Sequence, residues 1–139
     1  MRKISVLAAG FLLTAFAAIA QCETPTTWIA SKIEFLKSSG EVQTKPGTVT
    51  VTTDQKNIHV VTADGDEELK GNITDYTCNW QDSTNGMIGF KSEVTDKSGD
   101  VHHATIKIEA KDGKITFYLE AEEEQTKIRL PIDSYTVAK

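Results

Sequence analysis

The chain has 139 residues, with 15 Lys and Arg against 20 Asp and Glu and a formal net charge of −5. This length predicts one domain, and the proportions of hydrophobic (39%) and charged (25%) residues are typical of a globular protein, not a disordered one. The acidic balance argues against a nucleic-acid-binding surface, which needs clustered Lys and Arg. Two cysteines are too few for a Cys-rich zinc site or a disulfide-dense scaffold.

Residues 1–20 have the pattern of a bacterial secretory signal peptide. Two basic residues stand near the start, an apolar run covers 6–18, and Ala18-Ile19-Ala20 provides a small-residue cleavage site. The apolar run is shorter than the about 20 residues that span a membrane. We therefore predict cleavage after Ala20 and a periplasmic or secreted protein that begins at Gln21.

Cys22 has two alternative fates. In a bacterial lipoprotein it would carry the lipid and anchor the protein to the envelope, but Gln21 is bulky where such signals carry a small residue. Without lipid, Cys22 is expected to form a disulfide with Cys78 in an oxidising compartment. The membrane is thus a predicted partner only if Cys22 is lipidated.

The rest of the chain is predicted to be a flexible leader, 21–27, followed by a single β domain, 28–139. Apolar and polar residues alternate with period two in most segments, which is typical of strands wet on one face. Segment 28–36 also fits helical spacing, but Trp28 and Phe35 in so short a run favour a strand. The Ser-, Gly- and Pro-rich stretch 38–47 is predicted to be a loop. The predicted strands cover 28–36, 48–53, 58–62, 69–80, 87–95, 101–110, 114–121 and 127–132, with 135–137 extending the last.

Turn-forming residues separate these strands. Asp112-Gly113 is the clearest two-residue hairpin turn, and Asp-, Asn- and Gly-rich segments punctuate 54–57, 63–66, 82–86 and 96–100. The regular spacing predicts an all-β fold, a single antiparallel meander of about eight strands that closes into a small barrel. A β-sandwich is the alternative, although the Cys…Trp…Cys order of immunoglobulin domains is missing.

No constellation in the sequence indicates catalysis, a metal site or a cofactor. His102 and His103 are adjacent on a predicted strand, so their side chains point to opposite faces. Acidic residues cluster at 64–68, 96–100 and 122–124, but none of these clusters has the spacing of a calcium loop. We therefore predict that the protein is not an enzyme and uses no cofactor.

The signal peptide, the meander with Asp-Gly-type turns and Trp28 near the start of the first strand resemble small bacterial lipocalin-like proteins of the calycin type. The resemblance covers most of 27–137 and rests on pattern. The lipocalin G-x-W motif is absent because Trp28 follows Thr26-Thr27, and the arginine that closes a lipocalin barrel has no firm counterpart beyond Arg129 on a late strand. The resemblance implies a barrel that binds a small ligand.

Two functions remain open at this stage. The first is an exported binding module for an apolar or amphipathic small ligand, held near Trp28, Tyr76, Trp80 and His102 at an open end of the barrel. The alternative is an envelope structural or protein-interaction domain with no small ligand and an unidentified protein partner. A cavity favours the first, and a solid core with an exposed apolar edge favours the second.

Overall fold

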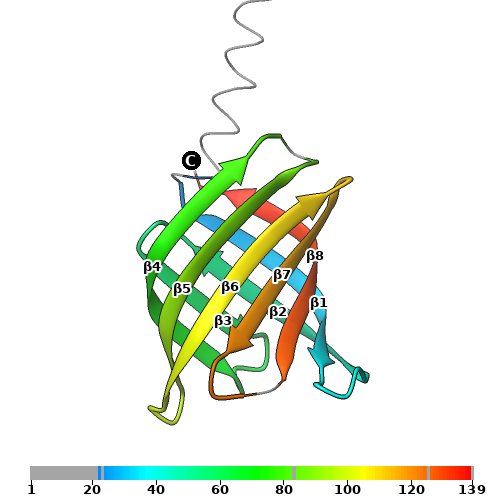
Figure 1. The fold of residues 1–139 in the computed structure, drawn as a ribbon, viewed down its shortest axis with the longest axis vertical. Coiled ribbons are helices and arrows are strands. Elements are labelled where there is room, and N and C mark those ends of the chain that lie inside the picture. The colour runs from blue at the N-terminus through cyan, green and yellow to red at the C-terminus, as the bar shows by residue number, and fades with distance from the viewer. Residues whose placement is uncertain (1–21, 23, 83, 125, 139) are drawn as a thin grey trace, which may run out of the picture.

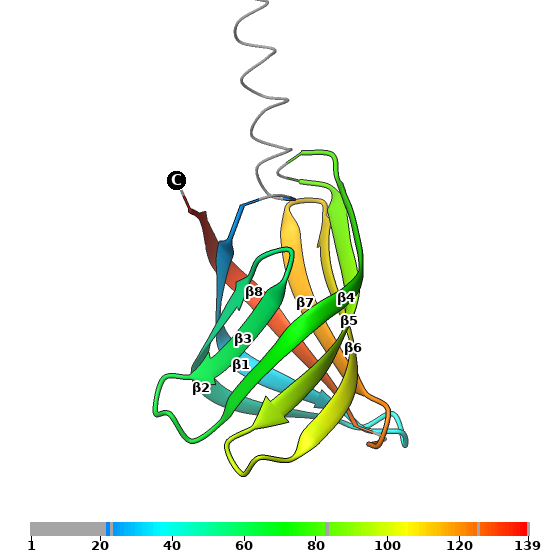
Figure 2. The same ribbon diagram turned by 90° about the vertical axis from the view of Figure 1, so that its left-hand side faces the viewer.

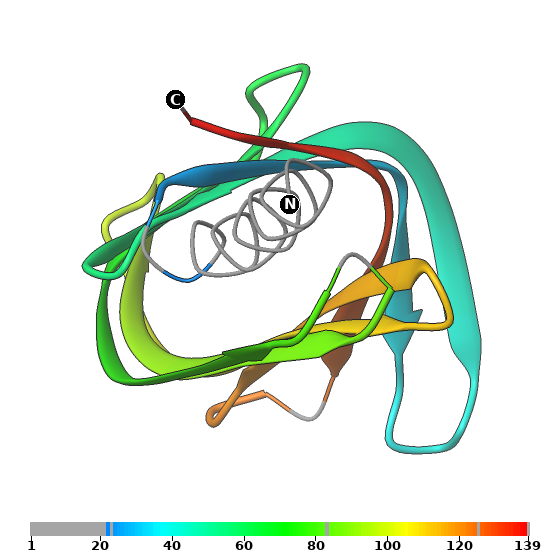
Figure 3. The same cartoon turned by 90° about the horizontal axis from the view of Figure 1, so that it is seen from above.

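The computed structural model describes residues 22, 24–82, 84–124 and 126–138. Eight strands follow one another around a closed barrel, and every neighbouring pair is antiparallel, including β1 with β8 (Figure 1). Seen from above, the strands form an unbroken ring (Figure 3). The strands are β1 (Thr26–Leu36), β2 (Val42–Thr53), β3 (Asn57–Thr62), β4 (Glu68–Trp80), β5 (Gly86–Asp96), β6 (Val101–Lys111), β7 (Lys114–Ala121) and β8 (Lys127–Val137).

This architecture confirms the predicted all-β meander and its closure into a barrel, and it excludes the sandwich alternative. Within the described residues, no helix is long and apolar enough to cross a membrane. The predicted signal peptide, 1–20, lies outside the described residues.

The first strand begins earlier than the sequence indicated. Segment 28–36 is a strand as predicted, but Thr26 and Thr27, which we assigned to the leader, already belong to β1. Thr26 pairs with Thr53 on one side and Val137 on the other. Two neighbouring strands thus supply backbone partners for a stretch whose own composition looks like a loop.

The predicted loop over 38–47 is wrong in its second half, because β2 begins at Val42. Residues 42–46 pair with β1, for example Val42 with Leu36 and Pro46 with Lys32. Because β3 pairs only with residues 49–53 of β2, Pro46 lies in a stretch that is paired on one side alone, and proline is tolerated in such edge segments. Gly47, with φ of +147°, lies at the register shift of this ribbon, a conformation that favours glycine.

Alternation along the strands decides which side chains fill the barrel. In β7, Ile115, Phe117, Leu119 and Ala121 are buried, whereas the residues between them are exposed or half-exposed. The other strands alternate in the same way where they face the core, whereas residues 42–48 of β2 are all exposed, and the inward side chains join one core. The largest fully buried side chains include Trp28, Phe117, Ile58, Ile88, Ile106, Ile108 and Leu130.

The meander gives the barrel two ends of different composition. Odd-numbered strands run one way and even-numbered strands run back, so the β1–β2, β3–β4, β5–β6 and β7–β8 connections share the lower end in Figure 1. At the upper end, β4 and β5 extend past β3, and their connection rises above the β2–β3 connection (Figure 2). We call the lower end the open end and the upper end the disulfide end, for reasons given below.

Candidate functional site

The barrel contains a cavity of about 430 Å³ that is reached from the open end. This volume falls in the lower part of the range of roughly 300–1,000 Å³ found for small-molecule pockets. The floor and walls are apolar and come from seven strands, β1 to β5, β7 and β8. They are formed by Ile33, Phe35, Val49, Val60, Leu69, Val94, Phe117, Leu119, Ala121, Ile128 and Leu130.

The rim of this cavity is strongly acidic. Six carboxylates line it, and the basic side chains among the lining residues are Lys45 and His102. The carboxylates come from three places that the meander brings to the same end. Asp64, Asp66 and Glu67 lie between β3 and β4 with Glu68 at the start of β4, Asp96 ends β5, and Glu124 follows β7. The three acidic clusters of the sequence therefore belong to one ring of negative charge.

His102 and Asp96 form a polar pair inside this rim. His102 Nε2 lies 2.9 Å from Asp96 Oδ2, and about a quarter of each side chain is exposed. The hydrogen bond to Asp96 raises the pKa of His102 above its ordinary value of 6.5, against the opposing effect of partial burial. The same hydrogen bond lowers the pKa of Asp96, which also accepts the backbone N–H groups of Ser98 and Asp100.

Two further carboxylates of the rim are held in their ionised form. The hydrogen bond from His59, 2.8 Å long, lowers the pKa of Glu68, and the hydroxyl of Thr62 does the same for Asp64. Lys97 joins two connections of the rim by donating from Nζ to the carbonyl of Gly65 at 2.7 Å. The pKa shifts of Asp64, Glu68 and Asp96 all favour the ionised carboxylate, so the rim is negative at neutral pH.

The disulfide end is filled by aromatic side chains. Trp28 is fully buried, lies 5.8 Å from Trp80 and 5.4 Å from Tyr135 between ring centroids, and donates from Nε1 to Thr53 Oγ1 at 3.0 Å. Tyr76 stacks on Phe90 with centroids 6.2 Å apart. These contacts leave the cavity to the other half of the barrel.

A disulfide joins Cys22 to Cys78 of β4 at this end, with the two Cα atoms 5.8 Å apart. Tyr76 donates its hydroxyl to the carbonyl of Cys22 at 2.9 Å, and Gln55 donates to the same carbonyl at 3.2 Å. Cys22 thus lies beside the part of β4 that extends past β3.

The four predicted ligand-binding residues do not meet. Trp28, Tyr76 and Trp80 gather at the disulfide end, whereas His102 lines the cavity at the open end. Strand order explains the separation, because Trp28 starts an odd strand and Trp80 ends an even one, while His102 starts an even strand. Counting strands along the meander would have separated them, and it would also have brought the acidic clusters together.

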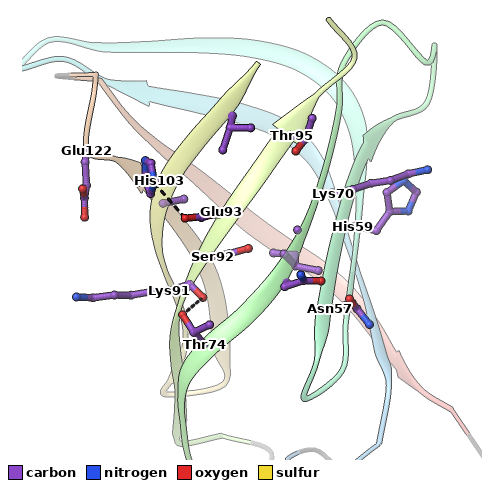
Figure 4. Close-up of a pocket in the computed structure, with 15 residues that line it drawn as sticks. Asn57, His59, Lys70, Thr74, Lys91, Ser92, Glu93, Thr95, His103 and Glu122 are labelled. Atoms are coloured by element: carbon purple, nitrogen blue, oxygen red, sulfur yellow. Dashed lines mark hydrogen bonds and ion pairs between the residues drawn. The ribbon is translucent and has the colours of Figure 1, made fainter. Parts of the chain in front are cut away.

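A second depression lies on the outer surface of β3–β6 and measures about 940 Å³ (Figure 4). Its outward side chains are polar apart from Val101, and they include His59, Lys70, Lys91 and Glu93. In Figure 4, Glu93 reaches toward His103, and the oxygen–nitrogen distance is 3.2 Å. A small apolar ligand would bury little surface against such a wall, so the inner cavity is the better candidate.

His103 also holds the connection that follows β7. Its Nδ1 lies 2.8 Å from Glu123 Oε1, and its backbone N–H donates to the same carboxylate at 3.0 Å. Among the described residues, no three His, Cys, Asp or Glu side chains are grouped to hold a metal ion. Arg129 faces outward on β8 and pairs with Glu34 of β1 at 2.8 Å, across the seam where the barrel closes.

Comparison with known proteins finds no relative: no protein-family model matches the chain, and no curated protein and no solved structure is significantly similar to it. The eight-stranded antiparallel closed barrel is compatible with a lipocalin-like fold.

Proposed function

We propose that the protein is an exported, lipocalin-like binding module that holds one apolar or amphipathic small molecule in the cavity at its open end, without catalysing a reaction on it. The observation that carries the proposal is the cavity of about 430 Å³ with apolar walls and a polar rim. Eight-stranded barrels have interiors that side chains either fill or leave just wide enough for one small ligand. Here the side chains fill one half and leave the other half hollow.

Two features support the exported location. The pattern of residues 1–20 is that of a secretory signal peptide. The Cys22–Cys78 disulfide suits an oxidising compartment such as the periplasm or the exterior of the cell. A Cys22 sulfur in a disulfide is not available for a lipid, so this arrangement favours an unanchored protein over the lipoprotein alternative.

The proposal is tested by titrating the purified protein with a neutral probe, N-phenyl-1-naphthylamine, whose fluorescence rises in apolar surroundings. We expect saturable binding of one probe per chain. Ala121→Trp should abolish it, because Ala121 lines the cavity near its mouth and the indole would occupy the space. Thr95→Trp is the matched control, since it places the same indole in the outer depression.

Wild-type protein that shows no saturable probe binding would contradict the proposal, and so would loss of binding in Thr95→Trp alone. A milder filling variant, Ala121→Phe, guards against a misfolded Ala121→Trp, and both are compared with wild type by circular dichroism. A protein that binds no probe in any form would favour the alternative of an interaction domain without a small ligand.

A further inference from the structure

We propose that the ligand of this cavity carries a primary amine, which lies at the rim while an aliphatic chain fills the apolar interior. This inference rests on the proposed binding function and specifies the chemical class of the ligand. It follows from the distribution of charge around an otherwise apolar cavity.

The cavity separates two chemistries along its depth. Deep in it lie aliphatic and phenyl side chains such as Phe117, Leu119 and Leu130, all almost fully buried. Polar groups are found at the mouth, in the connections between strands. A ligand that satisfies both parts has an apolar body and a single polar head.

The sign of the rim selects the charge of that head. Six carboxylates line the mouth, with Lys45 and His102 as the basic side chains among the lining residues. A carboxylate or phosphate head would meet like charge there, whereas a cation would be attracted. Fatty acids are therefore disfavoured although the apolar walls suit their chains.

Two carboxylates of the rim have no hydrogen-bonding partner among the described residues. Asp96 is paired with His102, and Glu68 with His59. Within the described part of the chain, the carboxylates of Glu67 and Glu124 line the mouth without a hydrogen bond or an ion pair, and the charge of Glu124 acts on His102 only through space, where it helps to raise the pKa of that residue. They belong to different connections, β3–β4 and β7–β8, so they are available to a bound cation from two sides of the mouth.

The nature of the acceptors favours an amine with N–H groups over a quaternary ammonium. Carboxylates form short charge-assisted hydrogen bonds with N–H donors, which a quaternary ammonium lacks. Quaternary groups are instead recognised by cages of aromatic rings. The aromatic side chains among the lining residues are Phe35 and Phe117, and Phe117 lies within the apolar interior.

The inference is tested by competition against bound N-phenyl-1-naphthylamine with three ligands of equal chain length: decylamine, decanol and decanoate, each below its aggregation concentration at pH 7.5. We expect decylamine to displace the probe at a concentration about tenfold lower than decanol does, as one charge-assisted hydrogen bond would give. Decanoate should be the weakest competitor.

Charge-neutral variants show whether the rim is responsible. The double substitution Glu67→Gln and Glu124→Gln should reduce the advantage of decylamine over decanol to about twofold or less, with each displacement referred to the probe affinity of that same variant. Glu109→Gln is the matched control, since it removes one outer-face carboxylate at the other end of β6. It should leave the order of the three ligands unchanged, which separates the rim from the general negative charge of the protein.

The outcomes distinguish the two proposals. Absence of probe binding contradicts the binding function itself. Probe binding with decanoate equal to or stronger than decylamine, or an amine advantage that survives in the double variant, overturns the amine inference and leaves the binding function standing.

Discussion

Phe117 and Tyr118 are neighbours in β7 with opposite surroundings. Phe117 is 1% exposed and forms part of the cavity wall, packed between the strands on either side at Ile108 and Leu130. Tyr118 faces outward, where Lys107 Nζ lies 4.9 Å from the centre of its ring. The two side chains therefore report on the inside and the outside of the same strand.

We expect Phe117→Ala to lower the free energy of unfolding by about 3 kcal/mol, because apolar contacts are lost and the existing cavity grows. Tyr118→Ala should cost less than about 1 kcal/mol, since it removes a half-exposed outward-facing ring and a weak cation–π contact. Urea unfolding of both variants measures the difference. Phe117→Ala should also change the affinity for the neutral probe, and Tyr118→Ala should not. Equal costs at the two positions would mean that both faces of β7 are covered.

At the scale of single residues, the sequence predicts well which side chains point into the barrel and which point outward. Alternation correctly placed Phe117 inside and grouped His102 with Ala104, Ile106 and Ile108. It carries no information about height along the barrel axis, so His102 was placed with residues from the other end. The pairings of His102 with Asp96 and of His103 with Glu123 depend on side-chain rotamers, which a pattern of residue types does not specify.

The connection after β7 is held to the start of β6 by a small charged cluster. Glu123 accepts hydrogen bonds from both the ring and the backbone of His103, and the backbone N–H of Glu122 donates to the carbonyl of His103 at 2.8 Å. Glu93 of β5 faces the other ring nitrogen of His103. Because Glu124 is the next residue in the chain, this cluster sets the position of one side of the rim.

The cluster should make the stability of this connection depend on pH. The hydrogen bonds from His103 lower the pKa of Glu123 from 4.5 to about 2, so its contribution is present above pH 4.5 and is lost as the pH falls toward 2. The Glu123 hydrogen bond raises the pKa of His103 above 6.5, so that contribution is present below pH 6.5 and is lost as the pH rises through the raised value.

We therefore expect the unfolding free energies of wild type and Glu123→Gln to differ most between about pH 4.5 and 6.5, and to converge at lower and higher pH. Denaturant titrations at a series of pH values provide the measurement. Glu122→Gln serves as the control, since its backbone N–H, not its carboxylate, contacts His103. A difference that stays constant from pH 3 to pH 9 would contradict the role of the ion pair.

At the scale of elements, agreement with the sequence depends on local chemistry. The observed bounds of β7, Lys114–Ala121, are those predicted, because a two-residue Asp-Gly turn precedes it and alternation is unbroken. The first half of β2 was missed, because Pro46, Gly47 and the polar residues around them have low strand propensity and are paired through β1. Long-range pairing of this kind overrides local preference.

The whole barrel is asymmetric, and the disulfide accounts for part of this. It joins residues 56 apart in the sequence, and it holds Cys22 against β4, where the hydroxyl of Tyr76 donates to the Cys22 carbonyl. The loop-entropy relation gives roughly 4 kcal/mol for a cross-link of this separation.

We expect Cys78→Ser to lower the free energy of unfolding by up to about 4 kcal/mol under oxidising conditions. Under reducing conditions, wild type and Cys78→Ser should unfold at nearly the same denaturant concentration. Cys22→Ser should match Cys78→Ser, because either change removes the same bond. Wild-type protein whose unfolding is unaffected by reductant would show that the bond contributes nothing.

At the scale of the whole molecule, strand order in the sequence also predicts which connections lie at the same end of the barrel. In an up-and-down barrel, every connection from an odd to an even strand lies at one end, so the clusters at 64–68, 96–100 and 122–124 must share that end. Strand order does not predict the size of the cavity, because this size depends on how Trp28, Trp80 and Tyr135 fill the opposite half. Packing volumes of this kind are not encoded in alternation.

Because side chains fill one end of the barrel, a ligand would enter and leave the cavity through the open end. With Trp28, Trp80 and the disulfide at the opposite end, a ligand would pass the carboxylates of the mouth both when it binds and when it dissociates. An amphipathic ligand would enter with its apolar chain first and leave with its polar head first, so the carboxylates of the rim would affect both its association rate and its residence time. Transfer of the ligand to another molecule would then require that molecule to face the open end, so the barrel axis would have a functional direction.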